Sequence, residues 1–351
     1  MYQMTGDERK AVTMKDVAAR AGVSPTVVSH VLHHKATSIR VSAATAERVR
    51  QAAQDLAYRV NVAARNFRDR QTTMLGVVHG HRSLTPRFDA GSRYFAALMD
   101  GIVDGAFAHG FSVALCPRLF GQTPEDAMSD GRFDGLIWYS SNPNDEDRAM
   151  IDRCSVPLVL IHSPGDGFDR TFPSVMCDNA QGIGLAVDHL VGLGHRRIAF
   201  ALPPVERIGE GRLRELGLYA ALERHGLEAD SERNLWLVQS DEEIDERLLA
   251  PNRSTAVIAW SDGMATHLIE RATALGLDLP RDLSIVGFDS TSYCNELRPR
   301  LTSISQPLVP LGRTAVDLLV QSVRGDLVPS FPLLMPCGLD LRESTARPRT
   351  H

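Results

Sequence analysis

The chain has 351 residues, of which 43% are hydrophobic and 23% charged, a composition that fits a globular protein of two or three domains. The net charge of −5 hides an asymmetry, because residues 1–70 carry 12 Lys and Arg against 6 Asp and Glu, and the rest of the chain carries 26 against 37. Only the basic head is therefore expected to contact a polyanion. The five cysteines are scattered, which argues against a disulfide framework. No long apolar run is present, which argues against a signal peptide and a membrane span.

Residues 13–33 predict two short helices joined by a tight turn. Apolar residues recur at helical spacing over 17–21, and Gly22 follows them where a positive φ suits glycine. Ser24 is a natural N-cap, and Pro25 stands at the first position of the second helix. This pattern is typical of the helix-turn-helix, whose second helix enters the major groove of DNA, although an ordinary helical hairpin has the same pattern.

A third helix is expected from about Ser42 or Thr45 to Leu56, and it completes a three-helix head over residues 11–57. Residues 58–71 are basic, with Phe67 as the one large apolar side chain among Arg65, Arg68 and Arg70. Because so short a helix is marginal by itself, we interpret this segment as a hinge helix that folds only on a partner.

Strands and helices alternate from residue 73 onward, which predicts parallel sheets wrapped by helices. About 270 residues of this pattern are too many for one core and indicate two lobes. The expected strands lie at 74–79, 111–115, 135–139, 157–162, 174–177, 197–202, 256–260 and 283–288, and the expected helices at 95–109, 182–193, 212–225 and 264–275.

Several short motifs, spread from end to end, resemble those of the lactose repressor/galactose repressor family of bacterial transcription regulators. They are Met14-Lys-Asp-Val-Ala, Ala21-Gly-Val-Ser, Val28-Ser, Val31-Leu, Glu47-Arg-Val, Tyr58-Arg, Ala64-Arg, Gly76-Val-Val, Asp178-Asn, Gly194-His-Arg-Arg-Ile, Ser284-Ile-Val-Gly-Phe-Asp and Leu301-Thr-Ser-Ile. The resemblance implies an α/β protein with a helix-turn-helix head, a hinge helix and a two-lobed body of the type I periplasmic-binding-protein kind.

The resemblance also implies domain boundaries, because the chain of such a body crosses between the lobes three times. We expect the N-terminal lobe at 72–173 and 304–332, and the C-terminal lobe at 174–303 and 333–346. It further implies a homodimer on a palindromic operator of double-stranded DNA. The chain ends without leucine heptads of the kind that pair dimers into tetramers, so we expect no tetramer.

The candidate DNA-binding residues come from the head and the hinge. They are Thr13, Lys15, Ser24, Pro25, Thr26, Ser29, His30, His33, Asn61, Ala64, Arg65, Phe67 and Arg68. Four of these positions or their neighbours depart from the family pattern: Val27 stands where threonine is usual, His30 where arginine is usual, Val60 where proline is usual, and Phe67 where a leucine wedge is usual. An apolar wedge between base steps kinks DNA, and Phe67 can act in this way, although packing against the dimer mate is the alternative role.

The candidate effector-binding residues are carried over position by position from the family. They are Tyr94, Phe95, His162, Arg214, Trp236, Ser261 and Asp289. A guanidinium suits vicinal oxygens, a carboxylate at the carboxyl end of a strand accepts from hydroxyl groups, and an indole offers an apolar platform, so Arg214, Asp289 and Trp236 favour a sugar or sugar derivative. Core packing is the alternative for Trp236, and one aromatic residue among positions 94 and 95 is expected in the cleft.

Two other classes of protein are alternatives to a sugar-responsive regulator. A purine- or nucleoside-responsive regulator would share the fold with more aromatic stacking in its cleft, and a solute-binding transport protein would share the body but not the basic head. Catalysis is not expected: Gly182 and Gly184 lack the third glycine of a dinucleotide fingerprint, and no phosphate loop or nucleophile elbow is present. The sequence thus predicts a cytoplasmic repressor that binds a small effector. No enzymatic activity, cofactor or metal is expected.

Overall fold

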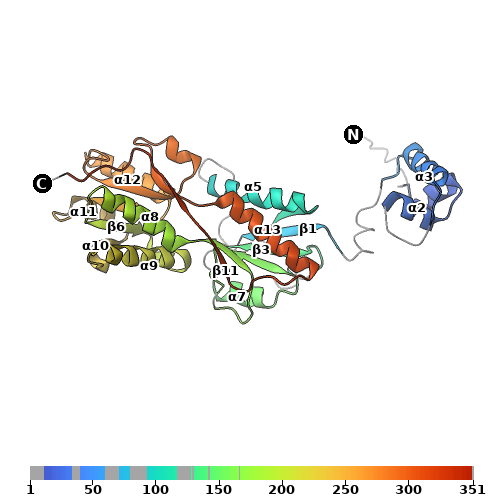
Figure 1. Ribbon diagram of the computed structural model, residues 1–351, viewed down its shortest axis with the longest axis horizontal. Coiled ribbons are helices and arrows are strands. Elements are labelled where there is room, and N and C mark those ends of the chain that lie inside the picture. The colour runs from blue at the N-terminus through green and yellow to red at the C-terminus, as the bar shows by residue number, and fades with distance from the viewer. Residues whose placement is uncertain are drawn as a thin grey trace, which may run out of the picture. The chain divides into compact units, whose positions relative to one another are not determined.

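The computed structural model describes residues 12–33, 40–59, 71–79, 93–116, 128, 130–140, 143–165 and 167–349. Contacts between residues divide the chain into two compact units, a head up to Thr72 and a body from Thr73 onward (Figure 1). The expected hinge residues Asn61, Ala64, Arg65, Phe67 and Arg68 lie outside the described residues.

The head contains three helices: α1 (Met14–Ala21), α2 (Pro25–His33) and α3 (Ala43–Asp55). Val17, Val28 and Val49, one from each helix, are completely buried and form the centre of its small core. Gly22 has a φ of 65° and its N–H reaches back to α1, so the predicted glycine turn is confirmed. The oxygen of Ser24 accepts from the Val27 N–H at 3.4 Å, as an N-cap does.

The first lobe of the body is built on a six-stranded sheet in the order β11-β5-β4-β3-β1-β2. Its strands, all parallel, are β1 (Met74–His79), β2 (Ser112–Cys116), β3 (Gly135–Tyr139), β4 (Leu158–Ile161), β5 (Ser174–Cys177) and β11 (Pro332–Met335). Toward one edge of the sheet, Leu75 of β1 lies opposite Gly135 of β3 and Val113 of the edge strand β2.

Helices cover both faces of this sheet, because alternate strand side chains point to opposite sides. Leu75, Ile137 and Val159 pack under α5 (Arg93–Ala108) and α13 (Leu308–Arg324), which run side by side in Figure 1. Leu136, Trp138 and Leu160 pack on the other face, with Met150 and Ile151 of α7 (Asp145–Asp152).

The second lobe repeats this three-layer arrangement on a sheet in the order β12-β10-β9-β8-β6-β7. The strands are β6 (Ile198–Leu202), β7 (Leu235–Leu237), β8 (Ala256–Ala259), β9 (Ser284–Asp289), β10 (Thr302–Ser305) and β12 (Gly338–Asp340). One face packs against α8 (Asn179–Gly192) and α9 (Gly209–Arg224), and the other against α11 (Asp241–Leu249) and α12 (Asp262–Ala274). The antiparallel pairing of β12 with β10 departs from the expected parallel sheets.

The predicted lobe boundaries need correction by a few residues. β5 pairs with β4, and β11 with β5, so residues 174–177 and 332–335 belong to the first lobe. β10 pairs with β9 and belongs entirely to the second lobe. The chain therefore crosses after Cys177, after Ser305 and after Met335, because each crossing follows a complete strand rather than preceding it.

The α-helices and strands not expected from the sequence are α7, the short α10 (Ser231–Asn234), β7, α11, β10, α13, β11 and β12. The most important is α13, which lies so close to α5 that a Cβ on Gly312 would stand 2.4 Å from the Leu98 carbonyl oxygen. Glycine is required there by the close approach of two backbones. Among the described helices, none is both long and apolar enough to cross a membrane.

Candidate functional site

The candidate DNA-reading surface of the head is the exposed start of α2. Ser24, Pro25 and Thr26 are exposed, and Ser29 and His30 one turn later are half-buried. Thr13 and Lys15, at the start of α1, are also exposed, and the Thr13 hydroxyl donates to Asp16 at 2.7 Å. His33 is the last residue of α2, and its side chain lies outside the description. The first turn of α2 thus presents short polar side chains, as a helix entering the major groove requires.

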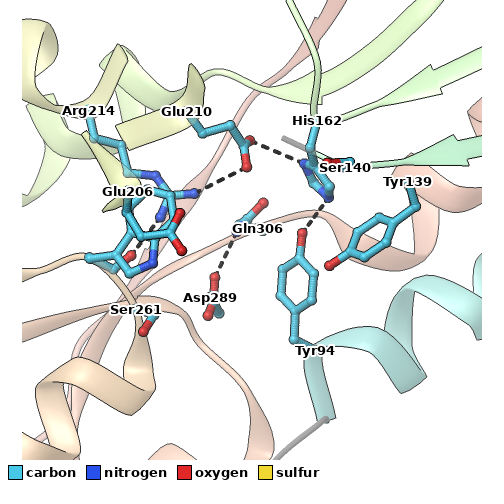
Figure 2. A pocket seen from close by; sticks show the side chains of 11 residues that line it. Tyr94, Tyr139, Ser140, His162, Glu206, Glu210, Arg214, Ser261, Asp289 and Gln306 are labelled. Carbon is cyan, nitrogen blue, oxygen red and sulfur yellow. Dashed lines mark hydrogen bonds and ion pairs between the residues drawn. The ribbon is translucent and has the colours of Figure 1, made fainter. Parts of the chain in front are cut away.

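A cavity of about 190 Å³ lies between the two lobes of the body. Most of its lining comes from positions at or just after the carboxyl ends of parallel strands, where ligand crevices form in open α/β sheets. The first lobe contributes Tyr94, Tyr139, Ser140 and His162, and the rest of the chain contributes Glu206, Glu210, Arg214, Trp260, Ser261, Asp289 and Gln306 (Figure 2).

Arg214 is held rigidly at the edge of this cavity. Its guanidinium stacks between two rings, with Cζ 3.5 Å from the Phe288 ring centre and 4.1 Å from that of Trp260. Nε donates to Asn179 Oδ1 at 2.8 Å, and Nη1 donates to the Trp260 carbonyl oxygen at 2.6 Å. These bonds use two of its five N–H groups, so the fixed fork retains donors for a ligand.

Glu210 links the two lobes across the cavity. Its Oε1 accepts from Asn179 Nδ2 at 3.2 Å and lies 3.1 Å from His162 Nδ1, and Oε2 lies 3.8 Å from Arg214 Nη2. The other ring nitrogen of His162 hydrogen-bonds to the Tyr94 hydroxyl, as the dashed lines in Figure 2 show. Burial opposes the charge of Glu210, but His162, Arg214 and Asn179 outweigh burial and lower its pKa to about 2.

Asp289 stands at the end of β9 in a strained backbone conformation. Its φ is 118°, and His162 across the cavity also has a positive φ of 65°, values that residues other than glycine adopt at a cost. Gln306 Nε2 donates to Asp289 Oδ1 at 2.8 Å. Burial, reinforced by the charge of Asp262, raises the pKa of Asp289 well above its usual range. Backbone strain at these two lining residues supports a binding role for the cavity.

Two acceptors in the cavity remain open. Gln306 Oε1 is buried and has no hydrogen-bond partner within the described part of the chain. The half-buried Glu206 carboxylate likewise forms no hydrogen bond or ion pair with any described residue. A bound molecule with hydroxyl or amino donors would satisfy both groups.

The structure brings five of the predicted effector residues to the cavity, namely Tyr94, His162, Arg214, Ser261 and Asp289. Ser261 also caps α12, because its oxygen accepts from the Met264 N–H at 3.2 Å. Two predictions need correction. Trp236 of β7 is 2% exposed and packs in the core of the second lobe with residues of α11. Phe95 of α5 is buried in the core of the first lobe. Both side chains fill apolar cores, where an indole or phenyl ring buries more area than in a polar cleft.

Six lining residues were missed by the sequence analysis: Tyr139, Ser140, Glu206, Glu210, Trp260 and Gln306. The rule that ligands bind at the carboxyl ends of parallel strands could have found Tyr139 and Trp260, which end or follow β3 and β8. Glu210 precedes Arg214 by one helical turn on α9, which was a second available signal.

Within the described ranges, no group of three or more His, Cys, Asp or Glu side chains is arranged to bind a metal ion.

Replacing Glu210 by glutamine tests the electrostatics of this network. Because the pKa of Glu210 in the folded protein lies below its ordinary value of 4.5, its charge stabilises the fold above about pH 4.5, and this contribution is lost as the pH falls toward 2. At pH 7 we expect Glu210→Gln to lower the free energy of unfolding by about 3 kcal/mol, since it breaks a buried ion pair. Denaturant unfolding at pH 7, 5, 4 and 3 should show that the difference in the free energy of unfolding between the variant and the parent protein becomes smaller as the pH falls.

The matched control is Asp278→Asn, which removes a carboxylate whose pair with Arg281 is exposed. This variant should lose little stability at any pH, because exposed pairs contribute about 0–1 kcal/mol. A gap between Glu210→Gln and the parent protein that stays constant from pH 7 to pH 3 would contradict the assignment.

Comparison with known protein families gives matches over both units. Residues 13–61 match the family of bacterial regulatory proteins called the lacI family, and residues 187–345 match the periplasmic binding protein-like domain. The lacI-family match spans the helix-turn-helix. The periplasmic binding protein-like match covers most of the second lobe, together with α13 and β11 of the first lobe.

Similar proteins extend these matches to nearly the whole chain. Catabolite control protein A of Priestia megaterium is 30% identical over 95% of this chain and 99% of its own length. The HTH-type transcriptional repressor PurR of Pectobacterium atrosepticum is 32% identical over 89% of this chain and 90% of its own length. The second of these relatives is named as a transcriptional repressor.

Solved structures agree. A lac repressor dimer bound to operator and an anti-inducer matches with a TM-score of 0.77 and 29% identity, covering 96% of this chain and all of that chain. A complex of the regulator CelR with cellobiose matches with a TM-score of 0.65 and 26% identity, covering 95% of this chain and 99% of that chain. The helix-turn-helix head, the two-lobed body and a relative of this similarity over nearly the full length establish that the chain belongs to the lacI family of bacterial regulatory proteins.

Proposed function

We propose that this lacI-family regulator represses transcription by binding a palindromic operator through its head, and that a small effector in the cavity between the lobes controls this binding. The observation that carries the proposal is the pairing of a basic helix-turn-helix head with a cavity that holds open hydrogen-bond groups. A DNA-binding role assigns the protein to the cytoplasm, at the nucleoid. An effector changes operator affinity only if it binds the two states of the protein differently.

The operator contacts are proposed from the exposed start of α2 together with Thr13 and Lys15. Thr26 is the exposed side chain best suited to a base edge, because a threonine hydroxyl and methyl group can both contact bases. Lys15 is assigned to phosphate, where a lysine acts as a point charge. Ser29, His30 and His33 continue along the same helix. Asn61, Ala64, Arg65, Phe67 and Arg68 remain candidates in the hinge.

Variants of the head separate these two roles. Lys15→Gln should weaken binding to all DNA sequences and reduce the slope of log affinity against log salt by about 1, because it removes one phosphate contact. Thr26→Ala should weaken binding to the selected operator by about 1–3 kcal/mol and leave non-specific binding unchanged. Operators selected from random DNA and fluorescence anisotropy at several salt concentrations provide the measurement.

The matched control is Arg50→Gln, because Arg50 is an exposed arginine on α3 that pairs with Glu47 at 2.9 Å. Its operator affinity and salt slope should stay close to those of the parent protein. Equal losses for all three variants would show that only the net charge of the head matters, and the proposed reading surface would then be wrong.

For the effector we propose a sugar or sugar derivative. Carboxylates at Glu206 and Asp289, the amide oxygen of Gln306 and the guanidinium fork of Arg214 alternate acceptors with donors around a small space, as a polyhydroxylated ligand requires. The volume of about 190 Å³ lies below the range of about 300–1,000 Å³ typical of drug-sized ligands and favours a small molecule. Arg214 stacks on the rings of Trp260 and Phe288, which reduces the aromatic surface for a purine.

A thermal-shift screen of monosaccharides, disaccharides, purines and nucleosides identifies the ligand class, and variants then test the site. Asp289→Gly should weaken the binding of the sugar by about 2 kcal/mol, because it removes a buried acceptor. Glycine tolerates the φ of 118°, so the substitution adds no backbone strain. Arg214→Lys should have a similar effect, since it keeps the charge but loses the fork. Arg224→Gln, an exposed residue of the same helix, is the control.

If a purine raises the melting temperature of the protein and no sugar does, a nucleoside-responsive regulator of the same fold is favoured. Unchanged ligand affinity in both Asp289→Gly and Arg214→Lys would place the effector outside this cavity.

We also propose that the protein acts as a homodimer, because a palindromic operator needs two heads related by a twofold axis. An apolar hollow of about 630 Å³ formed by α5, β2 and the start of α13 is a suitable contact for a second copy. Val103, Leu115 and Val309 line it while remaining 40–49% exposed, so they leave apolar surface for a partner to cover.

Light scattering of the full-length protein should give the mass of two chains at micromolar concentration. Val103→Asp should shift the protein toward the monomer and weaken operator binding, because it buries a charge in an apolar contact. Leu249→Asp, at a similarly exposed position on the second lobe, should leave the dimer intact. A mass of four chains, or a monomer that binds the operator at full affinity, would refute this assembly.

A further inference from the structure

A second hollow lies at the amino-terminal edge of the second sheet, at the opposite ends of the strands from the cavity between the lobes. Its volume is about 610 Å³, and it is formed where β6, β7 and β8 begin, beside α10 and α11. Five arginines line it, namely Arg196, Arg197, Arg233, Arg247 and Arg253, against two glutamates, Glu228 and Glu232. The body as a whole is acidic, so this excess of positive charge is local.

Four of these arginines lack the carboxylate partners that many other arginines of the body have. Arg233 pairs with Glu228 at 3.0 Å, but Arg196, Arg197, Arg247 and Arg253 form no ion pair with any residue that the structure describes. Elsewhere on the same lobe carboxylates neutralise the arginines: Arg224 pairs with Asp188, Arg271 with Asp245 and Arg300 with Glu343. The hollow therefore gathers positive charge without its usual compensation.

Backbone carbonyl groups hold the four guanidinium groups in place. Arg196 Nη1 donates to the His195 oxygen at 2.9 Å, and Arg197 Nε to the Arg253 oxygen at 3.0 Å. Arg247 Nη1 donates to the Glu232 oxygen at 2.8 Å, and Arg253 Nη1 to the Asp282 oxygen at 2.9 Å. Each guanidinium has five N–H groups, so this anchoring leaves most donors available.

The floor of the hollow is well ordered. Asn234 is 7% exposed and is fixed at both ends, because Nδ2 donates to the Ile198 oxygen at 2.7 Å and Oδ1 accepts from the Asp230 N–H at 2.8 Å. Trp236 and Ser254, at 2% and 8% exposed, complete the base. Anchored arginines thus surround a concave base with fixed hydrogen bonds, which a small ligand needs and a flat charged patch does not provide.

We propose that this hollow binds a small polyanion that carries two or more phosphoryl groups. The planar guanidinium fork matches phosphate oxygens, and a single monoanion would leave most of the uncompensated charge in place. A hollow of about 610 Å³ suits a small molecule, whereas specific binding of duplex DNA covers about 1,000–2,500 Å² of protein surface. The ligand would reach the protein independently of the effector cavity, because the two sites lie at opposite ends of the second sheet.

Titration calorimetry of the full chain with inorganic tripolyphosphate at 0.15 M salt tests the proposal. The parent protein should bind tripolyphosphate at least tenfold more tightly than orthophosphate, because several guanidinium groups act together. Arg247→Gln and Arg196→Gln, which lie on different elements, should each weaken tripolyphosphate binding by about tenfold, as expected for the loss of a charged hydrogen bond. Arg281→Gln, an exposed arginine of the same lobe that pairs with Asp278, should bind like the parent protein.

The basic head is another place where a polyanion could bind, and Lys15→Gln is the arm that detects this. The proposal is overturned if the parent protein binds no tripolyphosphate, or binds it no more tightly than orthophosphate. It is also overturned if Lys15→Gln weakens binding while Arg247→Gln and Arg196→Gln do not. Unchanged thermal unfolding of each variant excludes a folding defect, and none of these outcomes depends on the effector.

Discussion

The buried carboxylate of Glu210 is the group on which the arrangement of the cavity between the lobes depends. A charge at this depth is tolerated only when hydrogen bonds and opposite charges surround it, and His162, Asn179 and Arg214 meet this need. His162 belongs to the first lobe, whereas the other two belong to the second, so the groups that solvate this one carboxylate link the lobes across the cavity. A ligand that enters the cavity must therefore compete with, or join, an existing network.

The same network explains why Arg214 has so defined a position. Its guanidinium is stacked between Phe288 and Trp260 and donates to the carbonyl oxygen of Trp260, so strands β8 and β9 both determine where it points. A preorganised donor loses little freedom when a ligand binds, and more of the interaction energy then appears as affinity. The strained backbones of His162 and Asp289 are held in place by the surrounding sheets.

Charge is distributed in a way that separates the roles of the parts. The head is basic and the body acidic, so attraction to DNA is confined to the unit that carries the helix-turn-helix. Within the body, the arginine-lined hollow at the start of β6 and β8 is a local reversal of that sign. Because this hollow and the effector cavity lie at opposite ends of one sheet, two ligands could act on the same lobe without touching each other.

The sequence by itself determined the features that depend on local chemistry. Gly22, Ser24 and Pro25 mark the turn and the second helix through backbone geometry and capping, and alternating apolar segments indicate parallel sheets, so both were predictable from neighbouring residues. The positions of Arg214 and Asp289 in the cavity followed from the family pattern, and their binding of an effector stays a prediction. Only the tertiary structure decided the rest. Trp236 lies in the core and Trp260 in the cavity, because Trp236 is inside strand β7 whereas Trp260 follows the carboxyl end of β8, where the cavity forms. Gln306 and the crossing points after Cys177, Ser305 and Met335 likewise depend on contacts between distant segments, which no local pattern in the sequence records.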